Sequence, residues 1–302
     1  MRSKNPASRP TAILIAGPTA SGKSELAARL AQRYGGVVIN ADSMQVYRGL
    51  PILTAQPDDA LRASTQHLLY GHVPPERAYS VAQWLNDVDA ILKQIARHDE
   101  VPVFVGGTGL YFRALEMGLS PIPEPNPEIR RYWRDRAMEG GPALHLELER
   151  RDPKSAARIA PGDTQRIVRS LEVFDSTGKS ISSFRSIAGK ASPVLYDAQR
   201  MVLHVPTDVL AQRIDARFSH MMAEGALAEV QAIASLDLDP RLPAMKAIGV
   251  PQLLKYLGGE MSLTDAIEAA KIATRRFAKR QRTWFRNQLD ERWPWIMPDN
   301  LP

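Results

Sequence analysis

The sequence predicts an α/β protein: a P-loop parallel sheet with helices on both faces, plus a small, mostly helical insertion domain. First, the apolar run AILIA at 12–16 leads into GPTASGKS at 17–24, which has the spacing of a phosphate-binding loop (P-loop). Second, helical patterns separate three further apolar segments of strand character, at 37–41, 101–105 and 201–206. Third, a proline-rich stretch that begins at Ser120 leads into a strongly charged helical segment.

The helices are predicted from apolar residues that recur at helical spacing. After the P-loop, Leu26, Leu30 and Tyr34 share one face, and glycines end the helix. A second helix is predicted over 80–97, where apolar residues from Val81 to Ile95 form one face, and a third over 209–230. Residues 52–78 are predicted to be loop-like.

The P-loop motif predicts a site for a di- or triphosphate. Its glycines let successive backbone N–H groups point at one anion, and the helix that follows adds a partial positive charge. Lys23 is expected to neutralise the terminal phosphate, and Ser24 to help hold a magnesium ion. The alternative is a glycine-rich turn that only opens a helix. The predicted diphosphate-binding residues are Gly17, Pro18, Thr19, Ala20, Ser21, Gly22, Lys23 and Ser24.

Two loops that follow predicted strands carry further polar groups. Asp42 stands at the end of the second strand, on the sheet edge where the P-loop lies, although it could also be a helix cap or turn residue. The strand at 101–105 ends in Gly106-Gly107-Thr108-Gly109, where P-loop hydrolases usually have a magnesium-binding aspartate. This favours a group transferase in which Thr108 donates to a phosphate oxygen, with a simple tight turn as the alternative.

Composition limits the class of protein. The chain has 302 residues, 44% of them hydrophobic, and no cysteine, so thiol chemistry and disulfides are excluded. No apolar run approaches the length of a membrane span, and the first ten residues lack a signal core, so we expect a cytoplasmic protein that does not bind a membrane. His67 and His72 lack companions at metal-ligand spacing, so we expect them to have packing or surface roles.

The charged segment divides the chain into three parts: a first part of the P-loop core at 1–120, a helical insertion at 121–197, and a second core part at 198–302. The motif STGKS at 176–180 lacks the first glycine of a P-loop and is predicted to be a turn. In the predicted helix at 209–230, Arg213 and Arg217 lie one turn apart. They could neutralise a departing phosphate or simply face solvent.

The segment KIATRRFAKRQRTWFRN at 271–287 favours a polyanionic partner. It carries seven basic residues and no acidic one, and three aromatic residues are interleaved. Arg275 with Lys279, and Arg276 with Arg280, repel each other at i,i+4, whereas a solvated face normally mixes charges. For the whole chain, a formal charge of +6 is by itself compatible with ordinary solubility.

These motifs together resemble the tRNA dimethylallyltransferase family, also called tRNA isopentenyltransferase. The matching stretches are GPTASGKS, NADSMQVYR, VGGTGLYFRAL, DTQRIVRSLEV with TGKSIS, RFSHM with a later Glu-Gly, AIGVPQL and TRRFAKRQRTWFRN. They occur in the family's order from 13 to 287. The sequence departs from the family at Val250, where many members have tyrosine, and at QHLLYGHV, 66–73, which replaces a usual His-His-Leu-Ile-Asp. We expect both changes to alter packing or loop contacts.

The resemblance implies transfer of a dimethylallyl group from its diphosphate to the N6 amine of the adenosine just 3′ of the anticodon. Asp42 would accept the proton, while Lys23, Arg217, Thr108 and Mg²⁺ at Ser24 would stabilise the departing diphosphate. The protein would be a monomer whose partner is the tRNA anticodon stem-loop. The residues expected to contact tRNA are Asp42, Ser43, Met44, Gln45, Thr108, Arg130, Gln165, Arg166, Ile167, Val168, Arg169, Ser170, Arg276, Arg280 and Arg282.

Three alternatives remain open from the sequence. A small-molecule kinase would use the P-loop for ATP and the arginines for a lid, but would leave the basic segment and the insertion without a purpose. A relative that prenylates free adenine nucleotides would not need so large a basic surface. A nucleotide-gated RNA-binding protein without chemistry is opposed only mildly by Asp42 and the GGTG loop.

Overall fold

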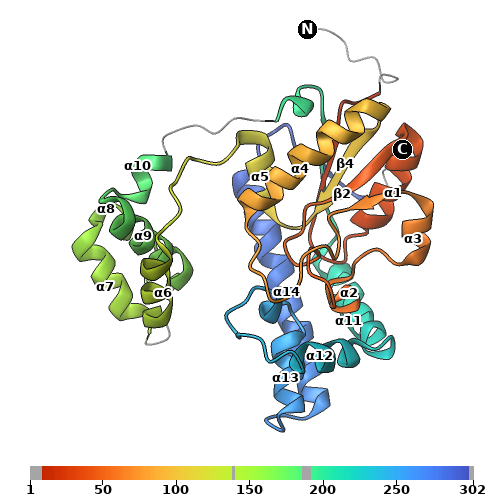
Figure 1. Ribbon diagram of the computed structural model, residues 1–302. Helices are drawn as coiled ribbons and strands as arrows, with labels where there is room; N and C mark the ends of the chain where they lie inside the picture. The colour runs from red at the N-terminus through yellow and green to blue at the C-terminus, as the bar shows by residue number, and fades with distance from the viewer. Residues whose placement is uncertain (1–8, 138–139, 186–191, 299–302) are drawn as a thin grey trace. The chain divides into compact units, whose positions relative to one another are not determined.

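The computed structural model describes residues 9–137, 140–185 and 192–298. The chain forms two compact units (Figure 1). Unit 1 contains residues 1–116 and 192–302, and unit 2 contains residues 117–191. Within the described ranges, no helix combines the length and the apolar character that crossing a membrane requires.

Unit 1 is built on a six-stranded sheet in which every pairing is parallel, as predicted. The strand order is β3-β2-β4-β1-β5-β6. The central strand β1 is buried along its whole length, so its sequence is continuously apolar rather than alternating. The strand bounds are Ile13–Ala16 (β1), Gly36–Asn40 (β2), His67–Leu68 (β3), Val101–Gly106 (β4), Gln199–Leu203 (β5) and Trp295–Ile296 (β6).

Helices cover both faces of this sheet, which confirms the predicted α/β architecture. On one face, Ile13 and Ile15 pack with Leu26 and Leu30 of α1 (Lys23–Tyr34). On the other face, Leu14 belongs to a cluster with residues of α4 (Val81–Ile95), α5 (Gly109–Met117) and the end of α14 (Leu263–Gln288). A short 3-10 segment, Ala96–His98, extends α4, and a second one, Pro193–Leu195, precedes β5.

A further helical cluster lies beyond the sheet edge where the P-loop is found. It joins α2 (Pro51–Thr54), α11 (Thr207–Ala223), α12 (Ala226–Ala234), α13 (Val250–Leu257) and α14 through buried apolar residues (Figure 1). The 3-10 segment Ala244–Lys246 contributes to it. Two helices of this cluster face the P-loop edge of the sheet. They are α11, which carries Arg213 and Arg217, and α14, which carries the basic segment 271–287.

Two predictions about local structure were wrong. The single helix expected over 209–230 ends at Ala223, because Gly225 adopts φ 108° and α12 then begins at Ala226. Residues 52–78 are not loop-like throughout, since they contain most of α2, all of α3 (Asp59–Ser64) and β3. These elements are two to six residues long, too short for apolar periodicity to reveal.

The regular secondary structure of unit 2 is helical throughout its described residues. Its helices are α6 (Pro127–Arg136), α7 (Gly141–Arg151), α8 (Pro153–Ala156), α9 (Thr164–Thr177) and α10 (Ile181–Arg185). They enclose a small core around the fully buried Trp133, whose indole N–H donates to Asp175 at 2.9 Å. The STGKS motif lies where α9 ends, with Gly178 in the left-handed conformation, so it forms a turn as predicted.

Candidate active site

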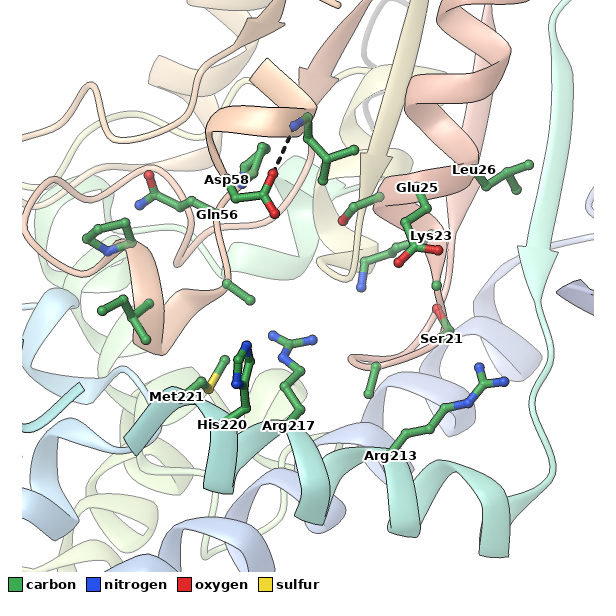
Figure 2. Close-up of a pocket in the computed structure, with 18 of the residues that line it drawn as sticks. Ser21, Lys23, Glu25, Leu26, Gln56, Asp58, Arg213, Arg217, His220 and Met221 are labelled. Atoms are coloured by element: carbon green, nitrogen blue, oxygen red, sulfur yellow. Dashed lines mark hydrogen bonds between the residues drawn. The ribbon is translucent and has the colours of Figure 1, made fainter. Parts of the chain in front are cut away.

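Two cavities in unit 1 meet at the P-loop. The smaller cavity has a volume of about 300 Å³ and lies between the P-loop, the loop after β2, α11 and α14. The larger cavity has a volume of about 1330 Å³ and is lined by the start of α1, by α2 and α3, and by α11 (Figure 2). Both are lined by Lys23, Ser24 and Arg217, so any phosphate held by the P-loop is in reach of both.

The P-loop has the backbone shape that an anion site needs. Ala20 and Gly22 adopt positive φ angles of 62° and 84°, and α1 begins directly afterwards at Lys23. The Ser21 hydroxyl is fully buried and has no hydrogen-bond partner among the described residues. The N–H groups at the start of α1 and this unpaired hydroxyl are suited to an anionic ligand.

Two cationic side chains converge on the P-loop. Burial lowers the pKa of the Lys23 ammonium from 10.5 to about 8, the Asp42 carboxylate opposes this change, and Arg217 adds to it. Burial also lowers the pKa of Arg217, again opposed by Asp42. Figure 2 shows Lys23 and Arg217 approaching the same space from α1 and from α11. Burial makes these cations costly to keep charged, so an anion between them is strongly favoured.

Arg213, one turn before Arg217, has a different environment. It is exposed and lines only the larger cavity. The pair predicted from i,i+4 spacing is therefore divided, with Arg217 at the junction of the cavities and Arg213 in the larger one. Near them, Asp58 caps α3 by accepting the Leu61 N–H at 2.8 Å, as drawn in Figure 2.

Asp42 is held at the sheet edge by a network around the buried Asn40. The Asn40 side chain accepts the Asp42 N–H at 2.8 Å and donates to the Asp42 carbonyl at 2.9 Å. One carboxylate oxygen of Asp42 accepts the Met44 N–H at 3.0 Å, so Asp42 does form a turn. Asp42 also lines the smaller cavity, and its negative charge favours the charged forms of Lys23 and Arg217. Both interpretations of Asp42 from the sequence are therefore compatible.

Thr108 holds the loop after β2 through the two chain neighbours of Asp42. Its hydroxyl accepts the Ser43 N–H at 2.9 Å and donates to the Ser43 hydroxyl at 3.2 Å, and its own N–H donates to the Ala41 carbonyl at 3.2 Å. Thr108 is not among the residues that line either cavity. Its donation to a phosphate oxygen stays a prediction, and in this structure its hydroxyl is committed to Ser43.

The glycines of the GGTG loop are needed for close packing within the protein. A Cβ at Gly106 would overlap the Ala41 carbonyl, one at Gly107 the Gln281 side chain, and one at Gly109 the Trp284 ring. The closest neighbours of this loop in the structure are Ala41, directly after β2, and the side chains of α14.

Much of the remaining lining of the smaller cavity is an apolar wall that the sequence motifs did not reveal, although Thr54, Lys246 and Thr274 also line it. It is lined by six apolar side chains from α2, α11, α14 and the loop before α13: Leu53, Ile214, Phe218, Met221, Ile248 and Phe277. Four of them lie on helices with ordinary amphipathic spacing, which predicts burial but not a binding role. A ligand with a charged end at the P-loop and a short hydrocarbon would match this cavity.

Comparison with known proteins decides the family. A family model described as IPP transferase matches residues 45–288, and one described as isopentenyl transferase matches residues 10–70. A tRNA dimethylallyltransferase of Rhizobium meliloti (strain 1021) is 54% identical over 295 residues, 96% of each chain. One from Methylobacterium radiotolerans is 51% identical over 293 residues, covering 96% of this chain and 94% of the relative.

The chain belongs to the tRNA dimethylallyltransferase family.

Solved structures of family members share its fold. A full-length tRNA isopentenylpyrophosphate transferase from Bacillus halodurans superposes with a TM-score of 0.67 at 34% identity, covering 94% of this chain and 89% of the other. A eukaryotic dimethylallyltransferase acting on tRNA superposes with a TM-score of 0.78 at 27% identity, covering 95% of this chain and 73% of the other.

The two departures from the family pattern are both in packed positions. Val250 is fully buried as the first residue of α13. In the 66–73 segment, Tyr70 is buried against the α1 face of the sheet, and burial raises the pKa of its hydroxyl. The His67 ring packs edge-on to Tyr70, with centroids 5.7 Å apart, and His72 packs in the same way on Tyr79. Both histidines thus have the predicted packing role.

The basic segment of this chain, residues 271–287, lies on α14, and its basic residues fall into three groups. Arg275 forms an ion pair with Asp215, Lys271 with Glu268, and Arg282 donates to the Thr207 hydroxyl at 2.6 Å. Arg280 lines the smaller cavity beside Phe277, with its guanidinium 5.7 Å from the ring centroid. A third group is exposed and has no acidic partner within the described parts of the chain: Arg276, Lys279 and Arg286.

The expected tRNA contacts in unit 2 are only partly at the surface. Gln165 and Arg166 are exposed, and Arg169 is half-buried beside Glu172. Three others are buried within unit 2, and their contact with tRNA stays a prediction: Ile167, Val168 and Ser170. Arg130 is half-buried, and its Nε has no partner among the described residues.

Two expected contacts in the loop after β2 are also engaged internally. The Gln45 amide donates to the Thr54 carbonyl at 2.9 Å and to the Ala55 carbonyl at 2.7 Å. Gln45 also lines the smaller cavity. Met44 packs against the helical cluster of unit 1 and lines the same cavity.

Proposed function

We propose that this protein transfers a dimethylallyl group from dimethylallyl diphosphate to the N6 amine of the adenosine 3′-adjacent to the anticodon in tRNA, releasing diphosphate. The observation that carries the proposal is the smaller cavity. Its lining includes a carboxylate, Asp42, and apolar side chains together with two cationic groups, Lys23 of the P-loop and Arg217 of α11. The dimethylallyl donor has the matching ends, a diphosphate and a five-carbon hydrocarbon.

The groups of the cavity account for each charge change in the reaction. The N6 nitrogen forms a bond to the first carbon of the prenyl group while the bond from that carbon to the diphosphate oxygen breaks. The electron pair of the broken bond leaves with the diphosphate, where Lys23 and Arg217 stabilise it. The amine loses a proton, which Asp42 accepts as the general base. The apolar wall excludes water that would otherwise intercept the developing allylic cation.

A magnesium ion fits this site as an ion carried with the diphosphate. The described residues hold no group of three or more histidine, aspartate or glutamate side chains that could bind a metal alone. Mg²⁺ characteristically keeps several waters and binds through one or two protein ligands plus substrate phosphates. The Ser24 hydroxyl, at the start of α1 and in both cavities, is the protein ligand that we propose. The ion would offset the charge of the diphosphate.

The tRNA would be held by basic residues on both units. On α14, the exposed Arg276, Lys279 and Arg286 have charges that no neighbouring carboxylate within the described ranges offsets. On unit 2, Gln165 and Arg166 offer an exposed polar start to α9. Such residues contact phosphates and carry no base specificity by themselves. We propose that the protein acts as a cytoplasmic monomer on the anticodon stem-loop.

A transfer assay with two acceptors and a parallel kinase assay tests the proposal. Purified protein is incubated with Mg²⁺, labelled dimethylallyl diphosphate and either unmodified tRNA with adenosine beside the anticodon or AMP, and a parallel reaction contains ATP labelled at the γ-phosphate. Label is expected in tRNA and not in AMP. Label in AMP would keep the chemistry and refute the tRNA substrate. Consumption of the γ-phosphate without prenyl transfer would indicate a kinase. RNA binding without any product would indicate a binding protein.

A further inference from the structure

One buried side chain of α14 joins the two loops that form the cavity. Gln281 is 5% exposed although it lies between two arginines of the basic segment. Its Oε1 accepts the Thr19 N–H at 3.0 Å, and its Nε2 donates to the Gly107 carbonyl at 3.0 Å. Thr19 belongs to the P-loop after β1, and Gly107 to the loop after β4. Because β1 and β4 are neighbouring parallel strands, both loops lie at one edge of the sheet.

The chemistry of this bridge requires a group that both accepts and donates, as a carboxamide does at every pH. Thr19 presents a donor and Gly107 an acceptor, so the bridging group must accept on one side and donate on the other. An ionised carboxylate can only accept, and it would face the Gly107 carbonyl with like charge. A thioether of similar length can make neither bond well. Gly107 itself leaves the space for the amide, since a Cβ there would overlap Nε2.

The bridge reaches both reacting groups through short connections. On one side, Thr19 lines the smaller cavity together with the P-loop residues that hold the diphosphate. On the other side, Gly107 precedes Thr108, whose hydroxyl holds Ser43 and whose N–H holds the Ala41 carbonyl. These two bonds flank Asp42 in the chain. A Cβ at Gly107 would also lie 3.2 Å from the Asp42 carboxylate, so the bridge and the base are close neighbours.

We propose that Gln281 is a positioning residue that sets the separation between the diphosphate and the Asp42 base. The inference rests on the proposed function. Gln281 acts through Thr19 and Gly107 and touches neither substrate in this account. Loss of the bridge should lower the rate of the chemical step by about 10- to 100-fold, the scale expected for a misplacement of roughly 1 Å. Binding of tRNA should change little, because the amide is buried beneath the basic face.

The test measures single-turnover prenyl transfer to tRNA for wild type, Gln281→Glu and Gln281→Met between about pH 5.5 and pH 8.5. A protonated glutamic acid can accept from Thr19 and donate to Gly107, whereas its carboxylate cannot donate. The rate of Gln281→Glu divided by the wild-type rate should therefore rise as the pH falls. For Gln281→Met the same ratio should be low and independent of pH. Division by the wild-type rate removes the pH effects that the variants share with the wild-type protein.

The matched control is Gln288→Glu. Gln288 is an exposed residue at the end of the same helix and accepts a hydrogen bond from Arg113 at 3.2 Å. Its rate ratio should stay near one at every pH. Near-UV circular dichroism establishes that each variant is folded. If the glutamate variant unfolds at neutral pH, the rate of Gln281→Met still tests the loss of the bridge. Affinity for tRNA is measured in parallel and should stay within a few-fold of wild type.

Two results would overturn the positioning role. One is a Gln281→Met rate within about threefold of wild type, and the other is a Gln281→Glu ratio that does not change with pH. A loss of tRNA affinity that accounts for the whole decrease in rate would instead assign Gln281 to RNA binding, and would also overturn it. Failure of the wild-type protein itself to transfer a prenyl group would refute the proposed function. The behaviour of the Gln281 variants tests only the positioning role, so the two failures are distinguishable.

Discussion

The lowered pKa of Lys23 should make binding of the proposed donor, dimethylallyl diphosphate, dependent on pH. Burial lowers this pKa from 10.5 to about 8, and this difference corresponds to a cost of roughly 3 kcal/mol for keeping the ammonium charged. A bound diphosphate supplies the opposite charge and returns the pKa towards its ordinary value. Below about pH 8, Lys23 is already charged when the donor arrives. Above that pH, the site must take up a proton, so the affinity should fall by about tenfold per pH unit.

Isothermal titration calorimetry with dimethylallyl diphosphate in the absence of tRNA measures this effect, because no acceptor is present. The terminal phosphate of the donor is fully ionised well above its own pKa of about 6, so it does not contribute a proton in this range. The Kd should be flat between about pH 7 and pH 8 and should then increase up to about pH 9.5. Repeating the titration in buffers of different ionisation enthalpy should show uptake approaching one proton at the upper limit.

Two variants separate Lys23 from other titrating groups. Lys23→Arg carries a charge that persists throughout this range, so its Kd should lose the pH dependence while much of the affinity remains. Lys23→Met should bind more weakly and should also show no pH dependence. A wild-type Kd that does not increase above about pH 8, without proton uptake, would refute the assignment of Lys23 as a buried ammonium that pairs with the diphosphate.

Further substitutions test the base, the packing, the metal and the RNA surface. Asp42→Asn should lower the single-turnover rate by about 10²- to 10⁴-fold with tRNA binding nearly unchanged, and a rate within a few-fold of wild type would exclude Asp42 as the base. Gly109→Ala should lower the free energy of unfolding by about 1–3 kcal/mol in denaturant titrations, because its Cβ would overlap Trp284, whereas Gly162→Ala, which has open space, should be near neutral. Ser24→Ala should raise the Mg²⁺ concentration that gives half-maximal transfer; an unchanged value would remove Ser24 as a ligand. Arg276→Ala should weaken tRNA binding and reduce the slope of log Kd against log salt by about 0.7–0.9, and an unchanged slope would mean that Arg276 meets no phosphate.

The sheet and the P-loop could be predicted because local sequence determines them. The strand β1 is a continuous apolar run, and β2, β4 and β5 each contain at least three consecutive buried residues. The GKS motif in its strand–loop–helix setting is typical of an anion-binding loop. Asp42 could be found in the same way, since it directly follows a strand at the edge that the P-loop defines. The short elements between residues 51 and 68 could not, because two to six residues carry no measurable period.

Gln281 and the apolar wall were not predictable for a different reason. Nothing in the sequence RFAKRQRTWF distinguishes a buried glutamine from an exposed one, because its burial depends on which helix face meets the GGTG loop. That meeting is a long-range contact between residues 107 and 281. The charge count has the same weakness, since Arg275 pairs with Asp215, a residue sixty positions away in the chain. Sequence composition counts such arginines as free, although tertiary pairing has already neutralised some of them.

The helix α14 explains why one segment can be both basic and structural. Residues three and four apart share a helix face, so Phe277, Gln281 and Trp284 point together towards the cavity and the GGTG loop. Lys279 and Arg286, one heptad apart, are exposed on another face. A tRNA bound to that outer face would contact the same helix whose inner face holds Thr19 and Gly107 through Gln281. Substitutions of the outer cations should therefore reduce tRNA affinity, while substitutions of the inner residues should reduce the rate at saturating tRNA. A variant of Lys279 that kept its affinity but lost rate would contradict this division of the helix.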